Sequence, residues 1–250
     1  MRFGVLGRLE IVDDEGRGIR ITAQRQRVLL VALLLKTNRV VPADALAETV
    51  WDGGPPSGAA NTLRAYVMRL RKTLGGGAGR LETHAPGYLL RTDPGEFDAA
   101  VFEEHCRRVG TTPRAEGHWE TIASEAAQAL TLWRETPLVD VPSATLRDAW
   151  VPRFEEQHLQ LTEWWIEAEM QLGTPHTLIP RLGGLVRQHP LREPLYRLQM
   201  LALARSDRTG EALAVYRQAR SVLIEQLGVE PGPGLRQLQQ RILGGDFSLC

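Results

Sequence analysis

Apolar residues follow one pattern in the first part of the chain and another pattern in the rest. Up to residue 92, stretches that alternate apolar and polar residues are mixed with segments of helical period. From residue 96 to residue 245, almost every segment repeats its apolar positions every three or four residues, as amphipathic helices do. The pattern predicts an α+β domain over residues 1–92 and an all-α domain over residues 96–245, joined by a turn-rich segment.

The first domain is predicted to be a winged helix-turn-helix. Thr22 is a suitable N-cap for the first long helix, and Pro42 suits the first position of the second helix. Glycines from residue 75 onward end the third helix. In chain order, the predicted elements are a strand at residues 3–12, a short strand at 19–22, helices at 22–36, 42–51 and 59–74, and a β-hairpin around residues 85–87.

The third predicted helix carries four basic residues and no acidic residue. Its apolar residues Leu63, Val67, Leu70 and Leu74 fall on one stripe. The residues that point the opposite way are Asn61, Ala65, Met68, Arg69 and Lys72. A helix held by its apolar stripe, with a cationic outer face, fits the major groove of duplex DNA, so this helix is predicted to be a recognition helix.

The second domain is predicted to be built from stacked helix pairs. Ala212, Tyr216 and Ala219 have the small-aromatic-small spacing of a tetratricopeptide unit, with Tyr196 and Leu203 at matching positions of the preceding helix. The predicted helices cover residues 97–109, 115–133, 145–172, 176–188, 192–205, 209–227 and 233–243. We therefore expect an all-α, tetratricopeptide-like domain with a concave face.

Composition narrows the function classes. Of the 250 residues, 43% are hydrophobic and 24% are charged, which is typical of a globular chain and unlike a disordered one. The longest apolar run, residues 28–35, is too short to cross a bilayer, so we expect a cytoplasmic, nucleoid-associated protein without a membrane partner. Cys106 and Cys250 cannot form a disulfide framework or a zinc site by themselves, and are expected to be reduced thiols.

The net charge of zero hides an unequal distribution. Up to Thr92 the chain has 14 basic and 8 acidic residues, whereas the remainder has 16 basic and 22 acidic residues. A basic module followed by an acidic one suggests that the first module contacts a polyanion. Charge asymmetry of this kind also serves solubility alone, so both interpretations stay open at this point.

The first half resembles the OmpR/PhoB-type DNA-binding domain as it occurs in the Streptomyces antibiotic regulatory protein (SARP) family. The resemblance rests on QRQRVLLVALLLKTNRVV from residue 24, LAETVWDGGPPSGAANTLRAYVMRLRKTLG from residue 46, and APGYLLR from residue 85. Its most specific parts are the loop at residues 51–56 and the L-R-x-Y-V-x-R-L-R-K spacing. The second half is similar to the bacterial transcriptional activation domain that accompanies it.

Several residues are expected to contact DNA. Arg69 is the first choice for reading a guanine edge, and the resemblance supports Arg69 and Arg71 most directly. The full candidate set is Asn61, Thr62, Arg64, Arg69, Arg71, Lys72, His84, Tyr88, Arg91 and Arg25. Five of these have a second interpretation. Asn61 and Thr62 are equally suited to be N-caps, Tyr88 is suited to pack under the wing, and Arg91 to be a solvated strand end. Arg25, which opens the first long helix with Arg27, is expected either to touch the DNA backbone or to be an ordinary surface charge, and the same two interpretations hold for Arg27.

The resemblance also implies partners for the predicted activator. It implies binding as tandem copies to direct repeats near the −35 promoter element, and control of a secondary-metabolite gene cluster. The loop formed by Trp51, Asp52, Gly53, Pro55 and Pro56 projects toward RNA polymerase in the resembled fold, so it is a candidate contact for the holoenzyme, including sigma factor. A loop that only sets the angle between two helices is the alternative.

No pattern points to catalysis, to a cofactor or to a metal. His158 with Glu155, Glu156 and Glu163 is better interpreted as the solvated face of a long helix, because a second ligand set is missing from the sequence. The tryptophans of the second half are interpreted as packing residues. Two alternatives to an activator remain: a tetratricopeptide-like scaffold for a protein partner, and a sensor whose effector occupies the concave helical surface.

Overall fold

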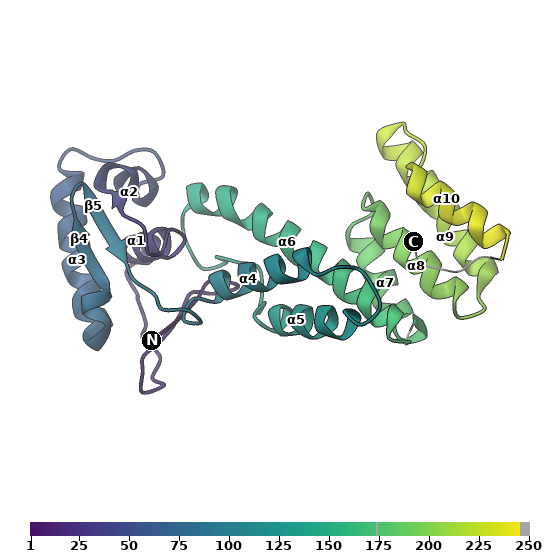
Figure 1. Ribbon diagram of the computed structural model, residues 1–250. Helices are drawn as coiled ribbons and strands as arrows, with labels where there is room; N and C mark the ends of the chain where they lie inside the picture. The colour runs from purple at the N-terminus through teal and green to yellow at the C-terminus, as the bar shows by residue number, and fades with distance from the viewer. Residues whose placement is uncertain (174, 246–250) are drawn as a thin grey trace. The chain divides into compact units, whose positions relative to one another are not determined.

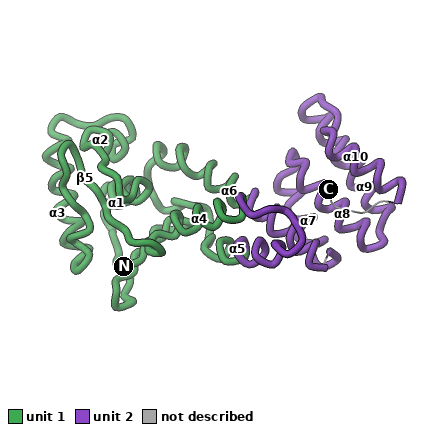
Figure 2. Tube along the Cα trace, in the orientation of Figure 1, with its two compact units in different colours: residues 1–110, 127–159 green, residues 111–126, 160–250 purple. Residues whose placement is uncertain are grey.

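A computed structural model describes residues 1–173 and 175–245 of the chain, whose elements are shown in Figure 1. The chain divides into two compact units (Figure 2). Residues 1–110 and 127–159 form the first unit, and residues 111–126 with the chain from residue 160 onward form the second. Within the described residues, no helix is both long and apolar enough to cross a membrane.

The N-terminal segment forms two short strands where one strand was predicted. β1 (Arg2–Gly4) pairs with β2 (Glu10–Val12) in antiparallel register, with Phe3 opposite Ile11. The prediction of one strand over residues 3–12 was wrong because the backbone leaves the sheet after Gly4. There, the N–H groups of Val5 and Leu6 donate to the carboxylate of Asp98 instead of to a neighbouring strand. Residues 19–22 are irregular and do not form the second strand that was predicted.

Helix α1 (Gln24–Leu34) is the central helix of the winged-helix fold. Its residues from Val28 to Leu34 are all buried, as the density of leucine and valine predicted. The predicted cap was wrong, because Ala23 occupies the N-cap position and Thr22 lies outside the helix. Helix α2 (Ala43–Val50) follows. Pro42 was predicted at the first helical position but is the N-cap, so the helix begins one residue later than predicted.

Helix α3 (Ala59–Leu74) begins after Gly58, whose φ of 84° requires the conformational freedom of glycine. Asn61 and Thr62 therefore lie in the first turn of the helix, and their interpretation as N-caps was wrong. The glycines after α3 form a 3₁₀ helix, η1 (Gly75–Arg80).

The predicted hairpin is confirmed and belongs to a three-stranded sheet. β5 (Gly87–Leu90) lies between β4 (Leu81–His84) and β3 (Val41–Pro42), and all the pairings are antiparallel. A Cβ atom at Gly87 would lie 1.8 Å from the carbonyl oxygen of Val41. The close approach of β3 and β5 therefore requires glycine at this position.

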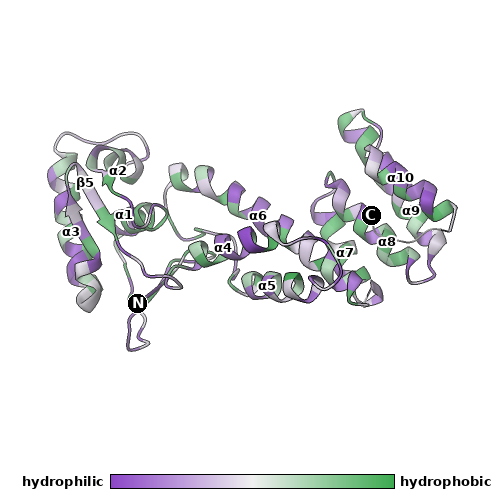
Figure 3. Ribbon diagram, viewed as in Figure 1, coloured by the Kyte–Doolittle hydropathy of each residue, from purple (hydrophilic) through white to green (hydrophobic). Residues whose placement is uncertain are grey.

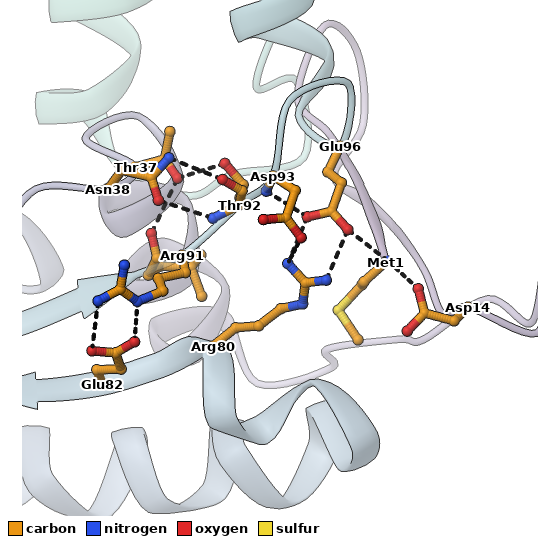
Figure 4. A network of polar contacts seen from close by, with 11 residues as sticks. Met1, Asp14, Thr37, Asn38, Arg80, Glu82, Arg91, Thr92, Asp93 and Glu96 are labelled. Carbon is orange, nitrogen blue, oxygen red and sulfur yellow. Dashed lines mark hydrogen bonds and ion pairs between the residues drawn. The ribbon is translucent and has the colours of Figure 1, made fainter.

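The segment after β5 is tied to the winged-helix fold at both of its ends (Figure 4). At one end, the Asn38 side chain donates to the carbonyl of Thr92 at 3.0 Å and accepts from its N–H at 3.1 Å. At the other end, Arg80 donates to both carboxylate oxygens of Glu96, at 2.6 and 2.8 Å. Two polar clamps thus fix residues 92–96 against the turn that follows α1 and against η1.

The remainder of the described chain is helical, as predicted. Helix α4 (Asp98–Thr111) belongs almost entirely to the first unit, whereas α5 (Trp119–Thr131) and α6 (Ala144–Gln171) contribute to both units. The second unit continues with α7 (Pro175–Gln188), α8 (Glu193–Ala204), α9 (Thr209–Leu227) and α10 (Pro233–Leu243).

The tetratricopeptide-like positions form the core of the second unit. Tyr196, Leu203, Ala212, Tyr216 and Ala219 are all buried where α8 packs against α9. Met200, which replaces the usual small residue, is also fully buried. In the first unit, burial raises the pKa of the Cys106 thiol to about 12, while Cys250 lies outside the described residues.

Candidate nucleic-acid interface

Helix α3 carries both hydrophobic and hydrophilic residues along its length (Figure 3). The hydrophobic ones form the predicted buried stripe, since Leu63, Val67, Leu70 and Leu74 are at most 1% exposed. The exposed residues of the opposite side are Asn61, Arg64, Met68, Arg69 and Lys72. Because the apolar stripe anchors the helix in the domain, the cationic side is left to meet an anionic partner.

The cations of this outer face differ in how they are held. Within the described residues, the side chains of Arg69 and Lys72 have neither a hydrogen-bond partner nor an ion-pair partner. Arg64 donates to the amide oxygen of Asn61 at 3.2 Å, one turn earlier in the helix. Arg69 and Lys72 are therefore open to a ligand, while Arg64 and Asn61 form a small polar pair.

Arg71, which was expected to contact DNA, is hydrogen-bonded to the wing. Its Nε donates to the carbonyl of Leu81 at 2.8 Å, and its Nη2 donates to the hydroxyl of Thr83 at 2.9 Å. Both acceptors belong to β4, so Arg71 joins the recognition helix to the wing. A contact of Arg71 with DNA stays a prediction, and in this structure its visible role is to orient the wing.

Glu82 organises the wing. Its carboxylate accepts from Nε of Arg91 and lies 2.6 Å from Nε2 of His84. The hydrogen bond from Arg91, followed by that from His84, lowers the pKa of Glu82 to about 2. Two predicted DNA contacts, His84 and Arg91, thus share one anionic partner on the wing, and a phosphate would compete with that partner for them.

We expect the Glu82 carboxyl to titrate near pH 2 in the folded protein. Because the folded pKa is lower than the ordinary value of 4.5, the contact stabilises the fold at pH values above 4.5. This stabilisation is lost as the pH falls through about 2. Carbon-13 NMR of the side-chain carboxyl would measure the titration, and a midpoint near 4.5 would show that the wing contacts do not persist in solution.

Two further residues predicted to contact DNA make contacts within the domain instead. Tyr88 is 7% exposed and lies in the middle strand of the sheet, which favours the interpretation that it packs under the wing. Arg25 donates to the carbonyl of Val50 at 3.1 Å, and its guanidinium lies 5.3 Å from the ring centre of Trp51. These contacts give both residues a structural role, and sequence patterns alone did not distinguish that role from DNA binding.

The predicted polymerase loop has an anchored start and an exposed remainder. Trp51 stacks on Tyr66 of α3 with ring centres 6.0 Å apart. Asp52 accepts from the hydroxyl of Ser143 at 2.7 Å and from the backbone N–H of Thr145 at 3.2 Å, and the Ser143 hydrogen bond lowers the pKa of Asp52. The segment 53–58 is exposed. The contact of Asp52 with the start of α6 gives no signal in the sequence, because Ser143 and Thr145 lie 91 and 93 residues after Asp52.

The first unit contains a second connection that the sequence did not reveal. Arg27 donates from Nη1 to the carbonyl of Asp140 at 2.8 Å. The same nitrogen lies 3.2 Å from the Asp140 carboxylate. Nη2 of Arg27 also donates to the carbonyl of Ile21 at 2.9 Å. Arg27 thus anchors the segment before α6 to the start of α1.

The cluster around His158 is not a solvated helix face throughout. The His158 ring lies against the Trp133 ring, tilted by 32°, with ring centres 4.3 Å apart. Glu163, predicted to be solvated, is 5% exposed and pairs with Nε of Arg192 at 2.7 Å. Within the described residues, no group of three or more histidine, cysteine or acidic side chains is arranged to hold a metal ion. The prediction was wrong for Glu163 because Arg192, 29 residues later at the N-cap of α8, pairs with it.

Comparison with known proteins identifies the class. The model of the bacterial transcriptional activator domain matches residues 97–243, and the model described as transcriptional regulatory protein, C terminal, matches residues 16–90. An OmpR-type winged helix followed by this activator domain defines a class of bacterial transcriptional regulators. The chain belongs to the Streptomyces antibiotic regulatory protein (SARP) family of transcriptional activators.

The relatives differ in length. Regulatory protein DnrI of Streptomyces peucetius is 34% identical over 255 residues, covering 98% of this chain and 93% of DnrI. Regulatory protein AfsR of Streptomyces griseus is 38% identical, and the match covers 100% of this chain but 25% of AfsR. A solved structure of Mycobacterium tuberculosis EmbR in complex with a low affinity phosphopeptide superposes with a TM-score of 0.91 at 34% identity, covering 98% of this chain and 65% of that chain.

Proposed function

We propose that this chain activates transcription by inserting α3 into the major groove of promoter DNA. The observation that supports the proposal most strongly is the division of α3 into a buried apolar stripe and an outer face with Arg69 and Lys72 unpaired among the described residues. The major groove of B-DNA admits a helix, and a guanidinium can bind a guanine edge through two hydrogen bonds. The relatives are regulatory proteins by name, which agrees with this function.

The proposal extends to the arrangement on DNA and to the target. Family resemblance supports tandem binding to direct repeats about one helical turn apart near the −35 element. Copies bound at that spacing lie on one face of the duplex and self-associate there. Resemblance also supports a secondary-metabolite gene cluster, such as one for an antibiotic, as the regulated target. We also propose that the protein acts in the cytoplasm, at the nucleoid.

Selection of bound duplexes from a random pool tests the proposal directly. The purified chain is expected to enrich one repeated motif, to protect it in footprinting, and to increase transcription from a promoter that carries it. Affinity for the motif should fall with salt at a slope of about −0.9 for each phosphate neutralised. Equal affinity for every duplex, with no enriched motif, would contradict the proposal.

RNA polymerase recruitment is assigned to the exposed part of the loop between α2 and α3. Pro55 and Pro56 lie outside the anchored portion formed by Trp51 and Asp52, and both are exposed. Their fixed φ angles give the loop a defined shape without contributing to the DNA-binding face. A polymerase holoenzyme, including its sigma factor, is therefore the partner that we propose for this loop.

Replacement of both Pro55 and Pro56 by alanine is expected to separate activation from DNA binding. Affinity for the selected duplex should change by less than about twofold, because the substitutions lie on the surface away from the outer face of α3. Activation in a purified transcription assay should fall by about fivefold, the effect of losing one significant interface contact. Thr73→Ala, an exposed change at the end of α3, is the control. Unchanged activation would remove the loop from the polymerase interface.

A further inference from the structure

The outer face of α3 has an apolar side chain at its centre. Met68 is 69% exposed, and no other large hydrophobic side chain of the described residues is as exposed. Scattered exposed apolar residues are normal on protein surfaces. The position of Met68 is unusual, however, because three cations surround it on this face. No other large apolar side chain lies on the outer face of α3.

Helical geometry puts Met68 on the central line of the outer face. Asn61, Ala65, Met68 and Lys72 follow one another at spacings of four, three and four residues, so they share one side of α3. Arg64 and Arg69 lie beside this line. The sequence of groups along the face is therefore an amide, a methyl group, a thioether and an ammonium group.

The chemistry of the duplex offers one apolar group to such a side chain. In the major groove, each base pair displays hydrogen-bond donors and acceptors, and thymine alone adds a C5-methyl group. A thioether with several rotatable bonds adapts its shape to a small apolar target. An unbranched apolar chain between cations gains nothing from contacting phosphate, so its favourable position is against a base edge.

We propose that Met68 reads a thymine through the C5-methyl group, as a specificity-determining residue of the DNA interface. This inference rests on the proposed function, because it requires α3 to enter the major groove. Arg69, the adjacent residue, suits the O6 and N7 acceptors of guanine. The binding site is therefore expected to contain a thymine next to the base pair that Arg69 reads.

A second copy of the chain is a poor occupant for this surface. Arg64, Arg69 and Lys72 surround Met68, and α3 has no acidic residue to offset them. If the same faces of two copies met, like charges would be placed opposite one another, which opposes association. Charge complementarity thus favours a polyanion over a copy of the same helix.

Substitution of deoxyuridine for thymine tests the inference at the level of one methyl group. In the duplex selected from the random pool, each thymine is replaced singly, and binding is measured by fluorescence anisotropy. At one position we expect affinity to fall by about fourfold, the effect of losing one buried apolar carbon. With Met68→Ala, the same replacement should change affinity by less than about 1.5-fold, because the contact is already absent.

Leu227→Ala is the matched control, since Leu227 is 54% exposed on α9, outside the winged helix. This variant should keep the full response to deoxyuridine. Circular dichroism establishes that both variants are folded. Specific binding without a methyl effect, or with an equal effect in Met68→Ala, would overturn this inference and leave the proposed function intact. Binding without any sequence preference would overturn both.

Discussion

Replacement of Arg69 by alanine is expected to reduce the discrimination between the selected duplex and other DNA. A bidentate contact between a guanidinium and guanine contributes about 1–3 kcal/mol, so specific affinity should fall by roughly 5- to 150-fold. Arg69 has no partner among the described residues, and its loss should leave the fold unchanged. Anisotropy titrations with the selected duplex and with a scrambled duplex would measure both affinities.

Two further variants make the experiment specific for the Arg69 guanidinium. Arg236→Ala removes an exposed cation from α10 in the second unit, and it should leave specific affinity within about twofold. Arg69→Lys keeps the charge but loses the planar fork, so it should retain affinity for scrambled DNA while losing preference for the guanine. If Arg69→Ala binds the selected duplex as tightly as the original chain does, α3 is not the reading element.

Replacement of Asp98 by alanine is expected to give the largest loss of stability. The side chain of Asp98 is 8% exposed, accepts hydrogen bonds from the N–H groups of Val5 and Leu6, and lies 3.1 Å from Nη2 of Arg134. Burial raises its pKa, while the backbone donors and Arg134 act in the opposite direction. Removing the carboxylate leaves the N–H groups of Val5 and Leu6, both fully buried, without this acceptor, which costs about 1–3 kcal/mol of unfolding free energy for each N–H and is measurable by urea denaturation.

Glu104→Ala provides the control for Asp98→Ala on the same helix. Glu104 accepts from Arg107 and Arg108, but its side chain is 42% exposed, and solvent-screened pairs of this kind contribute little to stability. A similar loss for both variants would mean that the Asp98 contacts do not connect the N-terminal strands to α4. The urea midpoints of the two variants should therefore differ clearly at one protein concentration.

Local pattern was sufficient for the helices. The predicted bounds of α9 and α10 agree with the structure at both ends, because a long run of apolar residues at helical spacing leaves few other ways to bury that surface. The apolar stripe of α3 was predicted for the same reason. Helix starts were less predictable. Thr22 looked like a cap, yet α1 begins at Gln24.

Contacts between distant parts of the chain could not be predicted in the same way. Asp98 binds Val5 and Leu6, which are more than 90 residues away, and Asp52 binds Ser143 across a similar distance. The spacing of residues in the sequence does not predict such pairs, because tertiary packing alone brings them together. The partners of basic residues were equally hard to predict. Arg69 and Arg71 were both expected to contact DNA, but only Arg71 has hydrogen-bond acceptors on β4.

The two clamps on residues 92–96 have a mechanical consequence. Asn38 and Arg80 hold both ends of this connection, which restricts rotation of α4 against the winged helix. If α3 enters the groove as proposed, the direction in which α4 points is set by that groove. Along a row of tandem copies, the helical pitch of the nucleic acid would impose its own periodicity on the placement of these helices.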